Sequence, residues 1–257
     1  MAGKVKADTI QGESQLKFNI GETTYITVGG ASWNVALPMN VQTTLNVTGA
    51  TSLIDATVTG NLTVTGTTTY VNTAILTVQD KNIEVANVAT PTDTTADGAG
   101  LTIKGATNKN LTWQTATKSF TVDQGLDIQR IIETVTSNAT AINANTTIDV
   151  LSGAVNYWTA NVAANWTLNV RGNSSVMLDS IMGTNDSMTV AYLATQLSSN
   201  TYYQSAMQID GTSVTPKWQG GTAPSAGNAS SIDLYAFTII KTAANTYTVL
   251  GSQTQYA

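Results

Sequence analysis

The 257-residue sequence contains no cysteine and no histidine, and only 11% of its residues are charged. Without cysteine, neither disulfide bonds nor thiolate chemistry contributes. Without histidine, the sequence lacks the commonest general base and the commonest transition-metal ligand, which leaves carboxylates, lysine and tyrosine for acid–base work. These absences narrow the chemistry open to the chain, and we expect a protein that is not an enzyme and that holds neither a metal ion nor a cofactor.

Basic segments and long apolar runs are also missing. The net charge is -5 and the pI is about 4.5, whereas a protein that binds nucleic acid needs a basic face for the phosphates. No window of about 18 apolar residues occurs, so no membrane insertion is expected. Residues 1–15 carry lysines without an apolar run behind them, unlike a secretory signal. We therefore expect a protein made in a cytoplasm and released by a route such as lysis.

The most regular stretch is Leu45–Val78, in which threonine and branched aliphatic residues alternate and glycine recurs. The triplet Val-Thr-Gly occurs at residues 47–49, 58–60 and 64–66. Alternation with a period of two is the pattern of β-strands, and these side chains suit a pleated sheet. A glycine after a few such residues allows a tight turn. The stretch predicts a row of very short strands, which we call the shaft and assign to residues 38–80.

One copy of the shaft cannot bury its own apolar residues. Ordering the backbone of two residues costs roughly 2–4 kcal/mol, and burying the one valine-sized side chain in that pair returns only roughly 1.5–3 kcal/mol. Further copies of the chain around a symmetry axis would cover the apolar side chains and pair the strand edges. The sequence therefore predicts an all-β, elongated, homotrimeric fibre.

Two smaller β units are predicted on either side of the shaft. Residues 1–37 contain short alternating runs separated by turns, which fit a module for attachment to a larger particle, with Trp33 in a core or an interface. Residues 81–127 predict a small β knob. Its expected strands are Leu101–Lys104, Leu111–Gln114 and Phe120–Val122.

Residues 128–150 differ from their surroundings. Their apolar residues recur at spacings of three and four with no proline or glycine between them, which fits a short coiled helix. Threonine and asparagine are poor helix formers, so an extended linker fits as well.

Residues 151–257 are rich in aromatic residues and lack repeats. Their alternating runs predict a compact C-terminal β head of the sandwich or jelly-roll kind. The expected strands are Trp166–Val170, Met188–Leu193, Ser205–Ile209, Leu234–Ile240 and Thr246–Leu250.

The loop at residues 214–228 holds the candidate ligand-binding residues. Two prolines and three glycines interrupt it, so it cannot be a regular strand. Trp218 lies between Lys217 and Gln219, and a tryptophan beside amine and amide donors is typical of a saccharide-binding surface. The alternative is that Trp218 fills a gap in the head or in a subunit interface.

Acidic residues offer two further interpretations. Asp179, Asp186, Asp210 and Asp233 fall in the head, and two carboxylates at a suitable separation hydrolyse glycosidic bonds in some enzymes. Asp93 and Asp97 lie in a glycine-rich loop that suggests calcium, although the twelve-residue calcium loop with its terminal glutamate is missing. In both cases aspartate is more simply explained by its preference for turns.

Four segments resemble known phage proteins. Residues 165–196 and 202–257, which include NWTLNVRGNSSVMLDSIMGTNDSMTVAYLATQ, look like the C-terminal domain of fibre-like virion proteins of marine cyanobacterial phages. The opening GKVKADTIQ resembles the start of similar proteins, and LTVQDKNIEVAN at residues 76–87 is similar to a segment of many phage tail fibres. The resemblance implies a virion fibre and brings no catalytic motif with it.

Together these features predict a trimeric bacteriophage fibre that is part of the virion. Its partners would be its own copies, other virion proteins at the N-terminal unit, and a host surface glycan such as lipopolysaccharide at the head. Several weak sites on one rigid trimer would gain avidity. The alternative function is a purely architectural fibre that decorates the capsid or neck and binds no receptor.

Overall fold

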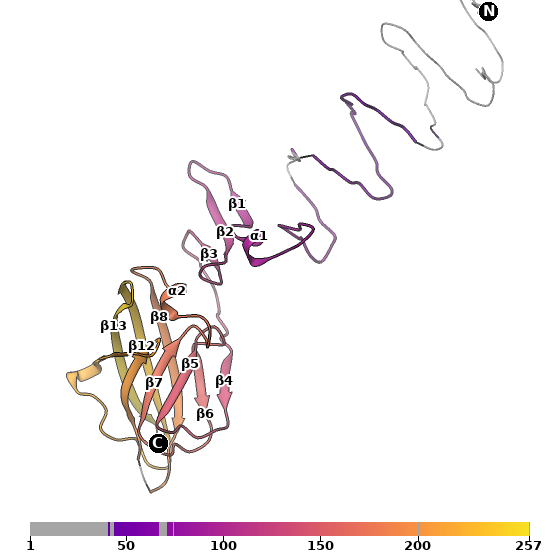
Figure 1. Cartoon of the computed structure of the whole chain (residues 1–257). Coiled ribbons are helices and arrows are strands. Elements are labelled where there is room, and N and C mark those ends of the chain that lie inside the picture. Colours follow the sequence, from indigo (N-terminus) through magenta and orange to yellow (C-terminus); the bar gives the residue numbers. More distant parts are fainter. Residues whose placement is uncertain (1–40, 42–43, 67–70, 74, 200, 257) are drawn as a thin grey trace, which may run out of the picture. The chain divides into compact units, whose positions relative to one another are not determined.

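A computed structural model describes residues 41, 44–66, 71–73, 75–199 and 201–256 (Figure 1). The chain divides after Leu76 into two units, Met1–Leu76 and Thr77–Ala257. The regular structure of the described residues is almost entirely β-strand, with two α-helices of four residues each and one short 3₁₀ helix. None of these helices is long and apolar enough to cross a membrane. The all-β class predicted from the sequence is confirmed.

The described residues of the shaft contain no strand. Residues 44–66, 71–73 and 75–78 are exposed throughout, and apolar side chains such as Leu45 and Leu62 keep 63% and 73% of their surface in contact with solvent. A strand needs a hydrogen-bonded neighbour, and the described residues of a single chain offer none here. The short strands predicted for the shaft are thus absent from those of its residues that the structure describes. The attachment unit of residues 1–37, with Trp33, lies outside the described residues.

A small antiparallel sheet follows in the second unit. A one-turn helix, α1 (Asp93–Ala96), precedes it and begins with a capping box between Thr92 and Thr95. The sheet has the order β1 (Gly100–Ile103), β2 (Lys109–Gln114) and β3 (Ser119–Val122). All three strands were predicted from the alternation of apolar and polar residues, and they are confirmed.

The head consists of two sheets, and the first six strands alternate between them. One sheet pairs β4 (Val135–Asn138), β6 (Val155–Trp158) and β8 (Ser187–Thr195) in parallel. The other pairs β5 (Asn145–Asp149), β7 (Trp166–Arg171) and β9 (Gln204–Ile209) in parallel. The chain therefore passes from one sheet to the other after each strand. A short helix, α2 (Leu178–Ile181), lies in the connection from β7 to β8.

Hairpins complete both sheets. β10 (Thr212–Val214) pairs with β9, which gives the order β10-β9-β7-β5. The long strands β12 (Ile232–Ala243) and β13 (Thr246–Tyr256) form an antiparallel hairpin, and β12 also pairs with β8. The two-residue strand β11 (Lys217–Trp218) adds to the edge of β13, so the larger sheet has the order β11-β13-β12-β8-β6-β4.

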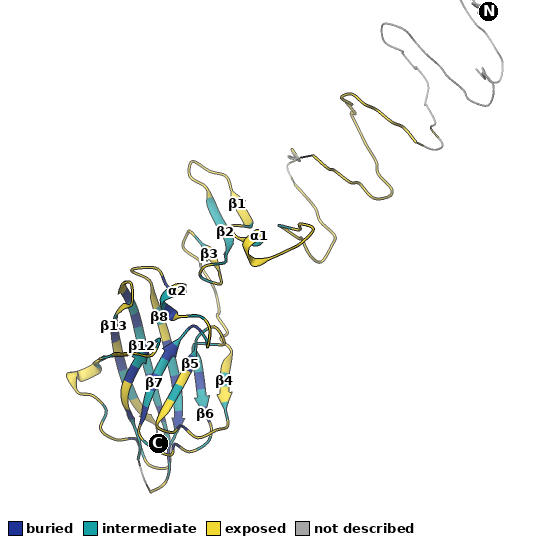
Figure 2. Ribbon diagram, in the orientation of Figure 1, coloured by how far each residue is buried: buried dark blue, intermediate teal, exposed yellow. Residues whose placement is uncertain are grey.

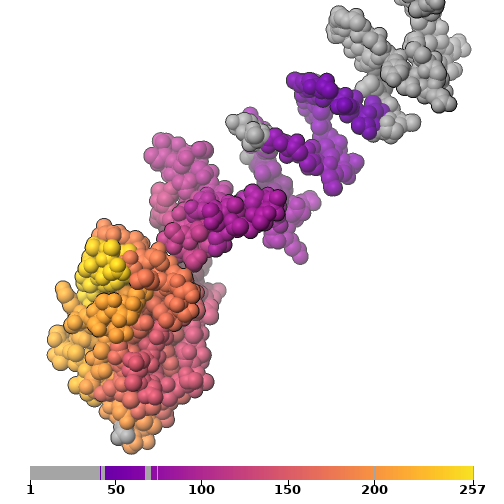
Figure 3. All heavy atoms as spheres, viewed as in Figure 1, coloured from indigo at the N-terminus to yellow at the C-terminus, as the bar shows by residue number. Residues whose placement is uncertain are grey.

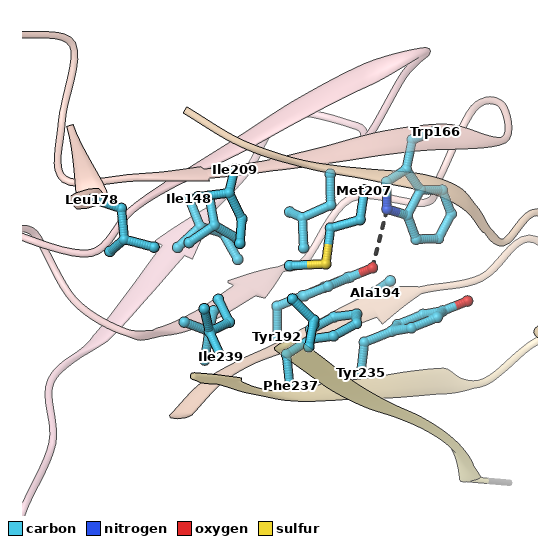
Figure 4. Packing of buried hydrophobic residues seen from close by; sticks show 14 of the residues in the cluster. Ile148, Trp166, Leu178, Tyr192, Ala194, Met207, Ile209, Tyr235, Phe237 and Ile239 are labelled. Carbon is cyan, nitrogen blue, oxygen red and sulfur yellow. Dashed lines mark hydrogen bonds between the residues drawn. The ribbon is translucent and has the colours of Figure 1, made fainter. Parts of the chain in front are cut away.

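The core lies between the two sheets (Figure 4). Buried and less buried residues alternate along the central strands, as Figure 2 shows for β7 and β12. The smaller sheet contributes Ile148, Trp166, Leu168, Val170, Met207 and Ile209, and the larger contributes Trp158, Val190, Tyr192, Ala194, Tyr235, Phe237, Ile239 and Val249. The five strands predicted for the head are present, each within a few residues of its expected bounds or longer.

Two expectations for this region need correction. The coiled helix considered for residues 128–150 is absent, because β4 and β5 lie there and pair with β6 and β7. Ile142, between these strands, is 1% exposed and belongs to the core, so the segment is not a linker throughout. The six strands from β4 through β9 pair in parallel within their sheets, which also differs from the antiparallel strands of a jelly roll.

Candidate functional site

Trp218 lies at the edge of the larger sheet. The chain leaves β10 at Val214, passes Pro216 and forms β11, in which Trp218 is opposite Gly251 of β13. Directly afterwards the chain turns at Gly220 and Gly221, whose φ angles of 75° and 80° lie in the left-handed region that glycine adopts without strain. The sequence missed β11 because a two-residue strand depends on its tertiary partner rather than on its own pattern.

One side of Trp218 packs against the core. Its ring meets Phe237 edge to face, with centroids 5.6 Å apart and planes at 69°. The ring also passes over Gly251, where no side chain separates it from the strand. Trp218 nevertheless stays partly exposed. It thus covers the core with one side, as the simpler interpretation had it, and offers the remainder of its surface to solvent.

The exposed part of Trp218 lines a shallow hollow of about 650 Å³. In the space-filling view the orange-to-gold atoms of this part of the chain lie at the surface of the head (Figure 3). Every residue around the hollow is uncharged, and most carry a hydroxyl or amide group. They are Trp218, Gln219, Thr222, Ala223, Pro224, Ser225, Ala226, Ser252, Gln253, Thr254 and Gln255. An aromatic wall with neutral hydrogen-bonding groups suits a neutral, hydroxyl-rich ligand.

The three residues predicted as ligand-binding are only partly brought together. Trp218 and Gln219 line the main hollow, whereas Lys217 does not. Lys217 lines a neighbouring hollow of about 420 Å³, which also includes Trp218 and Gln219. The main hollow therefore lacks the amine donor expected beside the tryptophan. Its polar groups include the hydroxyl and amide side chains of residues 252–255 of β13.

Gly251→Ala is expected to lower the free energy of unfolding by about 1–3 kcal/mol, because it overpacks the core. A Cβ at this position would lie 2.9 Å from Phe237 Cε1 and 3.1 Å from Trp218 Cε3. Denaturant unfolding measures the loss. Gly125→Ala is the control, since its Cβ would meet no atom within 4 Å. Equal stability of the two variants would show that Trp218 is not held over Gly251.

Side chains of β13 fix the wall of the hollow. Gln253 Nε2 donates to the carbonyl of Ala226 at 3.0 Å, and Gln255 Nε2 donates to the same carbonyl at 3.3 Å. Gln253 Nε2 also donates to the hydroxyl of Tyr235 at 3.0 Å. The loop that faces Trp218 is thus tied to the sheet and, through Tyr235, to polar groups in the core.

A buried carboxylate lies beside this wall. Asp233 is 0% exposed and accepts hydrogen bonds from Gln196 Nε2 at 2.8 Å and from the backbone N–H of Asn228. Burial raises the pKa of Asp233, and these hydrogen bonds oppose the rise. The sequence contained a usable signal: Asp233 is in phase with Tyr235 and Phe237 in β12, so the period of two places it on the inward face.

A second polar chain crosses the core. Trp166 Nε1 donates to the hydroxyl of Tyr192 at 3.1 Å, the hydrogen bond that Figure 4 marks with a dashed line. This hydroxyl donates to Gln204 Oε1 at 2.6 Å. Because the indole N–H can only donate, the Tyr192 hydroxyl accepts from Trp166 and donates its own proton to Gln204. The side-chain amide of Gln204 is therefore oriented with its oxygen toward Tyr192. Its Nε2 is buried and has no hydrogen-bond partner among the described residues. Gln204 also lines a hollow of about 320 Å³ on the β10 side of Trp218.

The head carboxylates considered for glycoside hydrolysis have structural partners. Asp210 accepts the backbone N–H groups of Leu178 at 2.7 Å and Asp179 at 3.0 Å, which caps α2. Asp186 Oδ2 accepts the N–H of Gly183 at 2.7 Å. Asp179 forms an ion pair with Lys241 at 2.9 Å.

The acidic residues of the knob also have partners. Asp97 Oδ1 accepts the N–H of Thr115 at 2.8 Å, and Asp93 lies 3.8 Å from Lys118 Nζ. Within the described part of the chain, no group of three or more acidic residues is placed to hold a metal ion.

The chain matches no protein-family model, no curated protein and no solved structure.

Proposed function

We propose that this chain is a structural fibre protein of a bacteriophage virion. It assembles as a homotrimer, docks on the virion through its N-terminal unit and presents the C-terminal head for adhesion to a host surface glycan. The resemblance of residues 165–196 and 202–257 to virion fibre proteins supports the class of protein. The distribution of apolar residues supports assembly, and the neutral hollow beside Trp218 supports adhesion.

The observation that carries the proposal is the contrast between the head and the residues before it. Among the described residues, twenty-four of the twenty-eight exposed large apolar residues lie before residue 136, while every buried one lies at or beyond Ile142. The described residues before residue 136 therefore form no core of their own. Since isolated apolar residues do not repay the entropy of ordering, other chains must cover them.

Identical copies fit this requirement. A partner must supply apolar residues along the described part of residues 41–135, and a second copy carries the same apolar residues over the same length. With only 11% charged residues, copies can also approach closely without strong repulsion.

Light scattering on the full-length protein tests the assembly. We expect a mass near three times 26.9 kDa. A monodisperse folded monomer would disprove the fibre.

A binding measurement tests the head. We expect the full-length protein to bind purified cyanobacterial lipopolysaccharide, and Thr254→Arg to weaken this binding at least tenfold because the new side chain fills the hollow. Thr254 is exposed and lines the hollow without supporting the core. Ser187→Arg, an exposed position outside the hollow, is the matched control and should bind normally. Absence of binding by the unmodified trimer would favour the purely architectural fibre.

A further inference from the structure

The small sheet of β1, β2 and β3 has two chemically different faces. Its antiparallel register places Leu101 opposite Leu111 and Leu111 opposite Val122, and it places Trp113 opposite Phe120. Residues directly opposite one another point to the same side of a sheet, as do residues two apart along a strand. One face therefore carries every large apolar residue of the three strands. They are Leu101, Ile103, Leu111, Trp113, Phe120 and Val122, and we call this surface the apolar face.

The opposite face is polar throughout. It carries Gly100, Thr102, Asn110, Thr112, Gln114, Ser119 and Thr121. Its side chains bond to one another: Thr102 Oγ1 donates to Asn110 Oδ1 at 2.9 Å, and Gln114 Nε2 donates to Thr112 Oγ1 at 3.3 Å. This face is suited to water. A sheet with such a division normally packs its apolar face on a core.

Among the described residues, most of the apolar face is open to solvent: Trp113 and Val122 are partly buried, and the other four residues are exposed. Phe120 is 71% exposed, Ile103 61% and Leu101 60%. Trp113 and Phe120 contact each other edge to face at 5.5 Å, which shields part of Trp113 only. A three-stranded sheet gains independent stability from a packed hydrophobic face, so the apolar face needs an occupant.

Charge and size both favour further copies of the chain as the occupant. The one charged residue on this side is Lys109, opposite Ile103 at the end of the strands, and its Nζ donates to Thr107 O at 2.6 Å and to Thr107 Oγ1 at 3.0 Å. Apart from Lys109 the face is uncharged, so identical copies would bring like charges together only at this end of the strands. Six side chains supply several hundred Å² per chain, less than the roughly 800 Å² per partner of a stable interface.

Apolar residues that flank the sheet in the sequence can supply the rest of the area that a stable interface needs. Exposed apolar residues continue before it, at Ile75, Leu76, Val78, Ile83, Val85 and Val88, and after it, at Leu126, Ile128, Ile131 and Ile132. An occupant that covers the whole run must itself carry apolar residues along a similar length. A small separate partner would cover the sheet alone and leave these residues in water.

We propose that the apolar face is the surface through which copies of this chain meet, with one such sheet from each protomer packed around the symmetry axis. The polar faces then point outward to solvent. This inference rests on the proposed trimer and assigns its interface to named residues of β1, β2 and β3.

Single cysteines test the proposal, because the natural sequence contains none. Phe120→Cys places a thiol on the apolar face, and Thr121→Cys, one residue further along β3, places it on the polar face. In dilute full-length protein under mild oxidation, we expect covalent dimers from Phe120→Cys and at least tenfold fewer from Thr121→Cys. Leu101→Cys and Thr102→Cys form a second matched pair on β1.

Light scattering on the same variants separates the possible results. Loss of the trimer in Phe120→Cys but not in Thr121→Cys also supports the interface. A trimer in which Thr121→Cys and Thr102→Cys cross-link as well as their partners, or in which no variant cross-links, overturns the assignment while the fibre stands. A monomer of the unsubstituted chain overturns the interface and the fibre together.

Discussion

Lys241→Met is expected to lower the free energy of unfolding by about 3 kcal/mol, because it removes the partner of several polar groups around a nearly buried charge. The side chain of Lys241 is only 8% exposed. Its ammonium group donates to the carbonyls of Asp179 at 2.6 Å and Met182 at 2.9 Å, and it forms the ion pair with Asp179 Oδ1. Methionine fills a similar volume but satisfies none of these groups. Urea unfolding at one protein concentration measures the loss.

Lys118→Met is the matched control. Lys118 also pairs with an aspartate, Asp93, but at 3.8 Å and with side chains that are 38% and 69% exposed. Exposed pairs of this kind contribute little, so the control is expected to retain its stability. If both substitutions had the same effect, burial would not explain the role of Lys241.

The ion pair between Lys241 and Asp179 is also expected to make the stability of the head depend on pH in the acid range. Hydrogen bonds from the backbone N–H of Asn245 and from Lys241 lower the pKa of Asp179 below its usual value. The unfolded chain therefore binds a proton at higher pH than the folded chain, and the contribution of Asp179 is present above the ordinary pKa and lost as pH falls through the lowered one. The acid loss of stability should be smaller in Lys241→Met than in the unsubstituted protein, as urea unfolding over a series of pH values measures.

The strands of the head could be predicted because apolar residues in the central strands alternate in the sequence with the same period of two as burial in the structure. In β7, and in β12 as far as Lys241, the side chains alternate between buried and less buried, which is the period that the sequence displays. The same period extends to Lys241 and Asp233, both in phase with Phe237. A charged residue at an inward-facing position of a strand signals a buried polar contact. This signal was missed because aspartate was explained by its general preference for turns.

Pairing could not be predicted in the same way. The parallel partners of β5, β7 and β9 are far apart in the sequence, and alternation says which face is buried but not which strand lies alongside. The helix considered for residues 128–150 was wrong for a related reason: the spacing of apolar residues does not show which neighbours they contact. Their spacing of three and four arises from exposed residues such as Ile131 and Ile132 together with the buried Ile142, which serve different environments and share no helical face.

The candidate site shows the same limit. Trp218 was found as an aromatic residue in a loop rich in glycine and proline, and its partial exposure agrees with that. The residues that face it across the hollow, Ser252 to Gln255, come from a strand more than thirty residues later. No local pattern links them to Trp218. They meet because β11 joins the edge of β13, and this contact depends on the folded sheet.

Tyr192→Phe is expected to lower the free energy of unfolding by about 2–4 kcal/mol while leaving the packing of its ring unchanged. Tyr192 is 0% exposed and stacks on Tyr235 with centroids 4.9 Å apart, contacts that phenylalanine keeps. Loss of the hydroxyl leaves Trp166 Nε1 without an acceptor and Gln204 Oε1 without a donor, and each buried unsatisfied group costs roughly 1–3 kcal/mol. Urea unfolding measures the change. Tyr157→Phe, at a partly exposed position, is the control and should be nearly neutral.

A double substitution decides whether the hydroxyl acts through these hydrogen bonds. Gln204→Met removes both the acceptor of the Tyr192 hydroxyl and the unpaired Nε2, so in the Tyr192→Phe background it takes away two unsatisfied polar groups at once. The double variant is therefore expected to be more stable than the sum of the two single losses predicts. Additive losses would mean that Tyr192 and Gln204 stabilise the head independently, and that the polar chain through the core is a geometric coincidence. A positive coupling would mean that the two sheets of the head are joined by polar as well as apolar contacts, since Tyr192 belongs to β8 of one sheet and Gln204 to β9 of the other.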